Sequence, residues 1–161
     1  MASLYLIPVT LGQTAIDRVL PAYNTDVIHS IRHFIVEEIR TARRFLKQVD
    51  RDIDIDSLTF YPMGKHADPA LFSRYLEPLR KGESVGVISE AGCPAVADPG
   101  ADVVAIAQRE GLSVVPLVGP SSILLSVMAR DSTDRALLST AICPSTAVAA
   151  ASVSNNWKRV P

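Results

Sequence analysis

The segment from Ser89 to Gly100 is the part of the sequence best suited to hold a small molecule. It reads SEAGCPAVADPG and follows an apolar run typical of a buried strand. Glycine and alanine at the end of a strand let a ligand approach the backbone, where exposed amides can bind a carboxylate or a ribose hydroxyl. The segment predicts either the floor of a small-molecule pocket or an ordinary tight turn. In the second case Asp98 would cap the helix that follows.

A second candidate segment, Gly119-Pro120-Ser121-Ser122, precedes an apolar stretch that predicts a helix towards Met128. A helix N-terminus with two hydroxyl groups can bind an anion or a hydroxyl. The alternative is a plain helix start, with serine as the cap and proline close to it. Under either alternative, the segment connects a predicted strand to a predicted helix.

A third candidate group consists of Glu37, Glu38 and Arg40, at another strand-to-helix junction. A carboxylate there could act on a substrate proton or orient a basic partner. Alternatively, acids in a first helical turn only complement the helix dipole. A basic stripe continues from this point at helical spacing, and it comprises Arg40, Arg43, Arg44, Lys47 and Arg51. The stripe could hold phosphate, or it could be a solvated helix face.

Several other chemistries lack their motifs. The sequence has no G-x-G-x-x-G after its first strand, no G-x-x-x-x-G-K-[ST] and no G-x-S-x-G. A dinucleotide enzyme, a P-loop hydrolase and an α/β-hydrolase are therefore disfavoured. The three histidines have no metal-ligand spacing, and Cys93 and Cys143 form neither a metal motif nor a disulfide framework. We therefore expect no metal site.

The composition is that of one ordinary globular domain. The chain has 161 residues, of which 48% are hydrophobic and 20% charged, and this balance argues against wholesale disorder. Sixteen basic and seventeen acidic residues give a net charge of −1, which weakens the case for a free-standing nucleic-acid binder. No apolar run approaches the roughly 20 residues that span a bilayer. The N-terminus has no basic region ahead of its short apolar stretch. We therefore expect a cytoplasmic protein without membrane contact.

Apolar runs and Gly/Pro punctuation predict strands that alternate with helices. The strands are expected at 4–7, 33–36, 58–61, 85–89 and 114–117, and the helices at 14–20, 38–49, 68–80, 101–110 and 122–128. This alternation predicts a parallel sheet covered on both faces. In such sheets the ligand lies beyond the carboxyl ends of the strands. The loops after the first, fourth and fifth strands are therefore the expected binding region.

Four segments carry a family resemblance: LYLIPVTLG at 4–12, FIVEEIRTARRFL at 34–46, GVISEAGCPAVADPG at 86–100 and VVPLVGPSS at 114–122. Together and in this order they resemble the tetrapyrrole (corrin/porphyrin) methylase superfamily of S-adenosylmethionine-dependent methyltransferases. Within it they look most similar to the branch that methylates a cytidine ribose 2′-hydroxyl in small-subunit ribosomal RNA. The resemblance implies an α/β fold. Residues 1–129 would form the parallel-sheet N-terminal domain of the methylase fold, and the second domain of that fold would be absent.

The resemblance also implies roles for individual residues. The implied donor-binding residues are Pro8, Gly12, Ser89, Glu90, Ala91, Gly92, Pro94, Gly119, Pro120 and Ser121. Glu37 and Arg40 match the acid and the arginine that face the substrate in the family, and we expect Glu37 to position the acceptor. The sequence departs from the family pattern at positions 10–13, and at Glu38, Glu90 and Cys93. These departures bear more on the acceptor than on the methyl donor.

The similarity stops at Met128 and Ala129. Residues 130–161 are rich in serine, threonine and alanine without a steady period, which predicts an irregular tail. Codons can be chosen for residues 129–149 that spell, in a shifted reading frame, the continuation seen in the family. We therefore hypothesise that the tail is frameshifted.

These observations favour a methyltransferase fragment that uses S-adenosylmethionine and acts on an RNA ribose or a tetrapyrrole-like acceptor. The expected partners are RNA or a small molecule, together with a second copy of the chain, because members of the superfamily are commonly dimers. Two alternatives belong to other classes. The chain could be a catalytically silent folded module that self-associates through an exposed apolar surface. It could also be a flavodoxin-like mononucleotide binder that uses the same loops.

Overall fold

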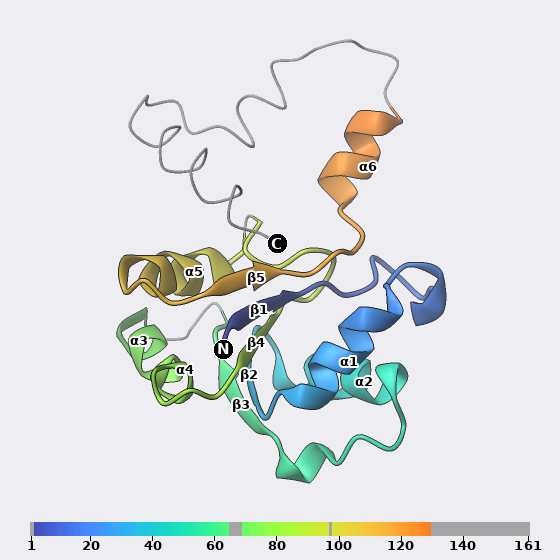
Figure 1. Ribbon diagram of the computed structural model, residues 1–161. Helices are drawn as coiled ribbons and strands as arrows, with labels where there is room; N and C mark the ends of the chain where they lie inside the picture. Colours follow the sequence, from blue (N-terminus) through green and yellow to red (C-terminus); the bar gives the residue numbers. More distant parts are fainter. Residues whose placement is uncertain (1, 65–68, 97, 130–161) are drawn as a thin grey trace. The chain divides into compact units, whose positions relative to one another are not determined.

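The computed structural model describes residues 2–64, 69–96 and 98–129. Five strands form one sheet: β1 (Leu4–Ile7), β2 (His33–Val36), β3 (Thr59–Pro62), β4 (Val85–Ile88) and β5 (Val114–Pro116). Their order is β3-β2-β4-β1-β5, and each neighbouring pair is parallel (Figure 1). The predicted α/β class with a parallel sheet is confirmed.

Six helices accompany the sheet: α1 (Ala22–Ser30), α2 (Ile39–Val49), α3 (Phe72–Tyr75), α4 (Glu77–Arg80), α5 (Gly100–Arg109) and α6 (Ser122–Met128). Helices α1 and α2 cover one face of the sheet, and α3, α4 and α5 cover the other (Figure 1). The chain divides into compact units at 1–126 and 127–161, and only 127–129 of the second are described. The predicted domain boundary at 129 and the frameshifted tail lie at or outside the limit of the described residues.

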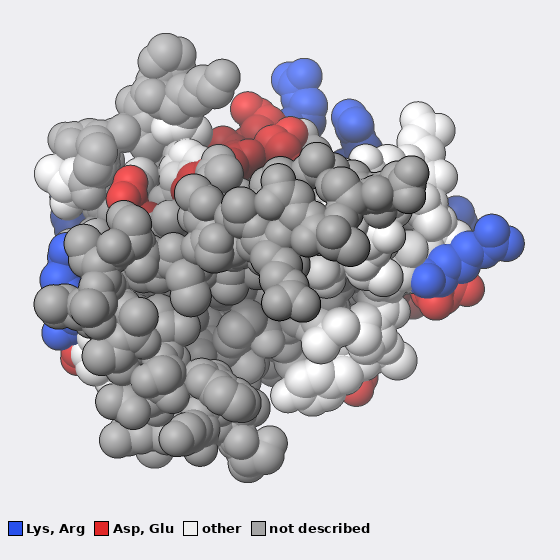
Figure 2. Space-filling model, turned by 90° about the horizontal axis from the view of Figure 1, so that it is seen from above, with Lys and Arg blue, Asp and Glu red and all other residues white. Residues whose placement is uncertain are grey.

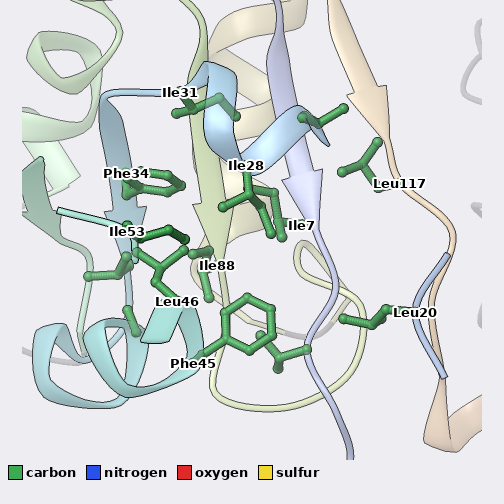
Figure 3. Close-up of a cluster of buried hydrophobic side chains, with 14 of the residues drawn as sticks. Ile7, Leu20, Ile28, Ile31, Phe34, Phe45, Leu46, Ile53, Ile88 and Leu117 are labelled. Atoms are coloured by element: carbon green, nitrogen blue, oxygen red, sulfur yellow. The ribbon is translucent and has the colours of Figure 1, made fainter. Parts of the chain in front are cut away.

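The core consists of two apolar layers, one on each face of the sheet. Under α1 and α2, side chains of the strands pack against both helices, as Figure 3 shows for Ile7, Leu20, Ile28, Ile31, Phe34, Phe45, Leu46, Ile53, Ile88 and Leu117. On the opposite face the buried residues include Leu4, Leu6, Ile35, Val85, Val87, Phe72, Leu79, Val103 and Ala107. Every residue of β4 is buried, because a central parallel strand is covered on both faces.

Pro21 begins a helix instead of ending one. The predicted helix over 14–20 is wrong: only a 3-10 turn at Ile16–Arg18 forms there, without a side-chain cap. Helix α1, which was not predicted, starts directly after Pro21. A proline fits the start of a helix because the first amide groups have no partner within the helix. The apolar pattern of 22–30 is weak, since only Val27, Ile28 and the polar Asn24 are buried.

The predicted helix over 68–80 is interrupted. Its described part consists of a 3-10 turn at Pro69–Leu71, then α3 and α4, which meet at Leu76. Pro78 lies in the first turn of α4, where its missing amide hydrogen breaks the helical hydrogen-bond series. Asp68, the predicted cap, lies outside the described residues. The predicted strand at 58–61 lies one residue later, whereas the predicted strand at 33–36 is confirmed.

Candidate functional site

The loops that follow β1, β4 and β5 are linked to one another at the carboxyl edge of the sheet. The backbone N–H of Val9 donates to the carbonyl of Gly92 at 2.9 Å, which joins the first loop to the second. The Cys93 thiol lies 3.4 Å from the Pro120 carbonyl and 3.7 Å from that of Gly119, which joins the second loop to the third. The loop after β4 therefore fixes the positions of both its neighbours.

Two of the predicted glycines are required by these close approaches. A Cβ on Gly119 would lie 2.3 Å from both Cβ and Cγ of Pro8, well inside van der Waals contact. Gly92 has a φ of +69°, and a Cβ there would meet Leu11 Cδ2 at 3.1 Å. Only glycine adopts such a φ without strain. The two glycines thus allow the three loops to pack tightly against each other.

Cys93 acts as a thiol donor in this arrangement. The residue is half-buried, and removal of the sulfur from water raises the pKa of the Cys93 thiol. A raised pKa keeps the proton on the sulfur at neutral pH, so that the thiol can donate weakly to the Pro120 carbonyl. Cys93 therefore has the properties of a structural link between loops and not those of a reactive nucleophile.

Glu37 connects β2 to the same edge. Its carboxylate Oε2 accepts a hydrogen bond from the backbone N–H of Glu90 at 3.1 Å. Its own backbone N–H donates to the Ile88 carbonyl at 3.4 Å, one residue beyond the paired part of β2 and β4. A bond from an amide to a carboxylate is stronger than one between neutral groups. Glu37 therefore orients the first residues of the loop after β4.

The two adjacent acids have different roles. Glu38 is the N-cap of α2, and its side chain accepts from the Arg40 N–H at 3.2 Å, as expected for an acid that complements a helix start. Glu37 instead lies against the loop after β4. Arg40 is exposed, and among the described residues its side chain forms no hydrogen bond or ion pair with the three loops.

A small cavity lies where α2 meets the loops after β1 and β4. Its volume is about 80 Å³, and it is lined by Val9, Thr10, Thr41, Ala42, Arg44, Phe45, Gln48, Ile88, Ser89 and Glu90. Sites for drug-sized ligands measure about 300–1,000 Å³. The cavity can therefore hold one part of a nucleoside-sized ligand and cannot enclose the whole of it.

Most of the predicted site residues are brought together at this edge. Pro8, Ser89, Gly92 and Pro94 are buried there, and Glu90 and Ala91 are exposed on the loop after β4. Ser121 caps α6, because its Oγ accepts from the Leu124 N–H at 3.4 Å, which agrees with the plain helix-start alternative. Gly12 is exposed, and a Cβ on it would meet nothing within 4 Å. The structure therefore gives Gly12 no close contact with the other loops.

Two further residues support the site. Asp98 accepts hydrogen bonds through Oδ1 from the N–H groups of Ala95 at 3.0 Å and Gly100 at 2.7 Å, so it bonds the first amide of α5 as predicted, although the N-cap position itself is Pro99. Asn24, which was not predicted, is 2% exposed, and its Nδ2 donates to the Val118 carbonyl at 2.9 Å. A polar residue among the inward positions of a helix could have identified Asn24, but the sequence pattern does not predict α1 itself.

The described residues contain neither a candidate metal cluster nor a helix that could span a membrane. No group of three or more His, Cys, Asp or Glu side chains is placed there to hold a metal ion. None of the described helices has the length and apolar character needed to cross a bilayer. In the view of Figure 2, the Lys and Arg side chains of the described part lie at the margins and are interspersed with Asp and Glu.

The sequence of this chain is similar to those of several known proteins. No protein-family model matches the chain. The ribosomal RNA small subunit methyltransferase I of Borrelia garinii is 31% identical over 113 residues, which are 70% of this chain and 48% of that protein. The protein of the same name from Leptospira biflexa is 45% identical over 58 residues, 35% of this chain and 24% of its own. The protein of the same name from Vibrio cholerae is 28% identical over 128 residues, which are 78% of this chain and 41% of that protein. The chain thus spans less than half the length of these curated relatives.

A solved structure shows a similar arrangement in space. The uroporphyrin-III-C-methyltransferase of Thermus thermophilus superposes with a TM-score of 0.54 at 16% identity, over 79% of this chain and 53% of that one. The chain has a tetrapyrrole methylase-like fold. The fold expected from the four sequence segments is therefore confirmed. The implied donor-binding and substrate-facing roles stay predictions.

Proposed function

We propose that this chain binds S-adenosylmethionine and forms one wall of the donor site of a methyltransferase that acts on RNA. The observation that carries the proposal is the set of linked loops after β1, β4 and β5, held at the edge where open α/β sheets bind ligands. The names of the sequence relatives support RNA as the acceptor. We further propose a cytidine ribose 2′-hydroxyl of small-subunit ribosomal RNA as the methylated group.

The residues at this edge fit a donor of that kind. Ala91 is exposed and has only a methyl side chain, whereas Gly92 is buried against Leu11 and, like Gly119, lets neighbouring loops approach closely. Such a backbone surface suits the carboxylate and ribose hydroxyls of the donor. The cavity of about 80 Å³ holds only part of it. We therefore propose that residues beyond the matched region of these enzymes supply the opposite wall.

S-adenosylmethionine, when bound, would supply a methyl group from its sulfonium, whose sulfur would keep the bonding electrons and leave as the thioether of S-adenosylhomocysteine, while the proton of the acceptor hydroxyl would pass to water. Such a transfer depends on alignment and on exclusion of water more than on a strong base. Within this chain, the linked loops would fix the donor. Glu37 would act as a positioning residue, because its carboxylate holds the Glu90 amide. Arg40, exposed beside it, would face the acceptor.

Calorimetric titration with S-adenosylhomocysteine, the demethylated product, tests the proposal. Two substitutions form a matched pair, because Gly92 and Gly111 have the same φ of +69°. Gly111→Ala introduces the same backbone strain in open space, away from the site. We expect saturable binding by the unsubstituted chain and by Gly111→Ala, and at least tenfold weaker binding by Gly92→Ala. Equal affinities of the two variants, or no binding by the unsubstituted chain, would count against the proposal.

The self-associating module is the second candidate function, and one observation favours it. Apolar side chains that follow β5 are exposed, with Val118 73%, Leu124 52% and Leu125 49% accessible. Exposed apolar surface of this kind favours association between copies. Sedimentation of the chain distinguishes the candidates: a concentration-dependent dimer without affinity for S-adenosylhomocysteine would support the module. A monomer that binds S-adenosylhomocysteine would exclude it.

A further inference from the structure

The charges of α2 are arranged unusually along the helix. Its eleven residues carry four cations and no acid, at Arg40, Arg43, Arg44 and Lys47. The segment directly after it carries acids at every second position, and they are Asp50, Asp52, Asp54 and Asp56. The inward face of α2 is apolar and packs in the core through Ala42, Phe45 and Leu46. Core packing therefore does not dictate the outward charges.

Part of this arrangement opposes the one that stabilises a helix, although Glu38 at the N-cap and Lys47 in the last turn agree with it. The N-terminus of a helix carries partial positive charge and favours acids, whereas the C-terminus favours cations. In α2 the cations begin in the first turn at Arg40, and Asp50 stands at the C-cap. Helix stability therefore does not explain Arg40 in the first turn or Asp50 at the C-cap, whereas an anionic partner at the N-terminal end would favour Arg40. The N-terminal end of α2 adds its own positive potential to that of the arginines.

Among the described residues, only Arg43 of the four α2 cations is neutralised by an ion pair, because the hydrogen bond of Lys47 goes to an uncharged carbonyl. Arg43 Nη2 pairs with Asp56 Oδ1 at 2.9 Å, and Lys47 Nζ donates to the Arg51 carbonyl at 2.8 Å. Arg40 and Arg44 form no ion pair within the described part of the chain. They are one helical turn apart, about 6 Å along the axis, and so lie on the same face of α2. Arg44 also lines the cavity beside Ser89 and Glu90.

We propose that Arg40 and Arg44 bind the phosphate backbone of an RNA strand at the entrance to the site, and that the acids after α2 confine the strand to that end of the helix. The inference rests on the proposed function, since it names the surface by which the RNA reaches the donor. Arginine suits phosphate because its planar fork can bind two oxygens at once. The acids beyond Asp50 repel phosphate, so the strand does not continue along Lys47 and Arg51.

Two double variants that remove the same charge test this polarity. One is Arg40→Gln with Arg44→Gln, the site-end pair, and the other is Lys47→Gln with Arg51→Gln, the far-end pair. Binding of a fluorescent single-stranded oligoribonucleotide is measured by anisotropy at 50 to 200 mM KCl. Each lost phosphate contact lowers the salt slope of log K by about 0.7, so the site-end pair should lower it by about 1.4. Between 50 and 200 mM KCl the loss of affinity should then be about sevenfold smaller than in the unsubstituted chain.

The far-end pair should leave the slope nearly unchanged. Equal decreases for both pairs would overturn the confinement by the acids, and no decrease for the site-end pair would overturn the inference. Tighter binding of poly-L-glutamate than of RNA would show an acidic protein as the partner and would also overturn it. Titration of the unsubstituted chain with S-adenosylhomocysteine separates the two proposals. If the unsubstituted chain binds S-adenosylhomocysteine but the site-end pair leaves the salt slope unchanged, only this inference is refuted. If the site-end pair lowers the slope but the unsubstituted chain does not bind S-adenosylhomocysteine, only the proposed donor site is refuted.

Discussion

Replacement of Gly119 by alanine should separate the loop after β5 from β1. The new Cβ would lie 2.3 Å from two carbons of Pro8, whereas an ordinary contact between carbon atoms is about 3.5 Å. One of the loops must therefore move by about 1 Å. The ring of Pro8 is buried and cannot rotate away, so the movement falls on the third loop and on its link to Cys93. Overpacking of this kind costs about 1–3 kcal/mol.

Urea denaturation followed by circular dichroism measures this cost. With an m-value of about 1–3 kcal/mol/M, the midpoint for Gly119→Ala should fall by about 1 M. Gly12→Ala is the matched control, because a Cβ there meets nothing within 4 Å. It should leave the midpoint unchanged or raise it slightly, since alanine restricts the unfolded chain. Equal midpoints for the two variants would refute the reasoning from the close approach.

A double-mutant cycle identifies the contact itself. Pro8→Gly removes both carbons that the new methyl group would meet. In that background Gly119→Ala should cost less, with a coupling of about 0.5–3 kcal/mol between the two positions. Additive effects would show that the strain arises elsewhere in the loop.

Three other substitutions test single contacts of the site. Asn24→Ala removes the donor to the Val118 carbonyl and should lower the free energy of unfolding by about 1–2 kcal/mol, measured in urea; an unchanged midpoint would contradict the contact. In a Cys143→Ser chain, iodoacetamide should modify Cys93 more slowly at pH 8 than it modifies a free cysteine, because burial raises the pKa of the Cys93 thiol. Because the pKa of the Cys93 thiol is higher in the folded chain, the unfolded chain loses this proton at lower pH. The stability that the buried, protonated thiol contributes is therefore lost as the pH rises above about 8.5. Cys93→Ala should remove this part of the pH dependence of the free energy of unfolding. Glu37→Gln replaces the charged acceptor of the Glu90 amide by a neutral one and should lower the free energy of unfolding by about 1 kcal/mol, measured in urea; an unchanged midpoint would contradict the importance of that charge.

The strands were predictable from the sequence because each is a short apolar run between turn residues. The central run at 85–88 is buried on both faces, and its continuous apolar character is the expected signal. Helices were predicted less well where proline was the main signal. Pro21 directly follows the helix predicted at 14–20 but instead precedes α1, and Pro78 lies inside the helix predicted at 68–80, which it interrupts. Proline permits a helix to begin and prevents it from continuing, so the same residue gives opposite signals.

The position of the site followed from topology, but its internal contacts did not. A parallel sheet with alternating helices places the loops after β1, β4 and β5 at one edge, and this was expected. The hydrogen bond from the Glu90 amide to Glu37 joins residues 53 positions apart, and no local sequence pattern predicts it. The requirement for glycine at 119 likewise depends on Pro8, which lies in the loop after β1. Such pairs become visible only when the register of the strands is known.

The links among the loops determine how the site should respond to change. The loops after β1, β4 and β5 are held together by contacts of the chain itself, so their shape does not depend on a ligand. A preformed surface binds with less loss of conformational freedom than one that must be ordered. Substitutions that move backbone, such as Gly92→Ala, should therefore weaken donor binding more than the removal of a single side chain, such as Ser121→Ala. The Ser121 hydroxyl already accepts a bond from the helix it caps, and its loss leaves the loops in place.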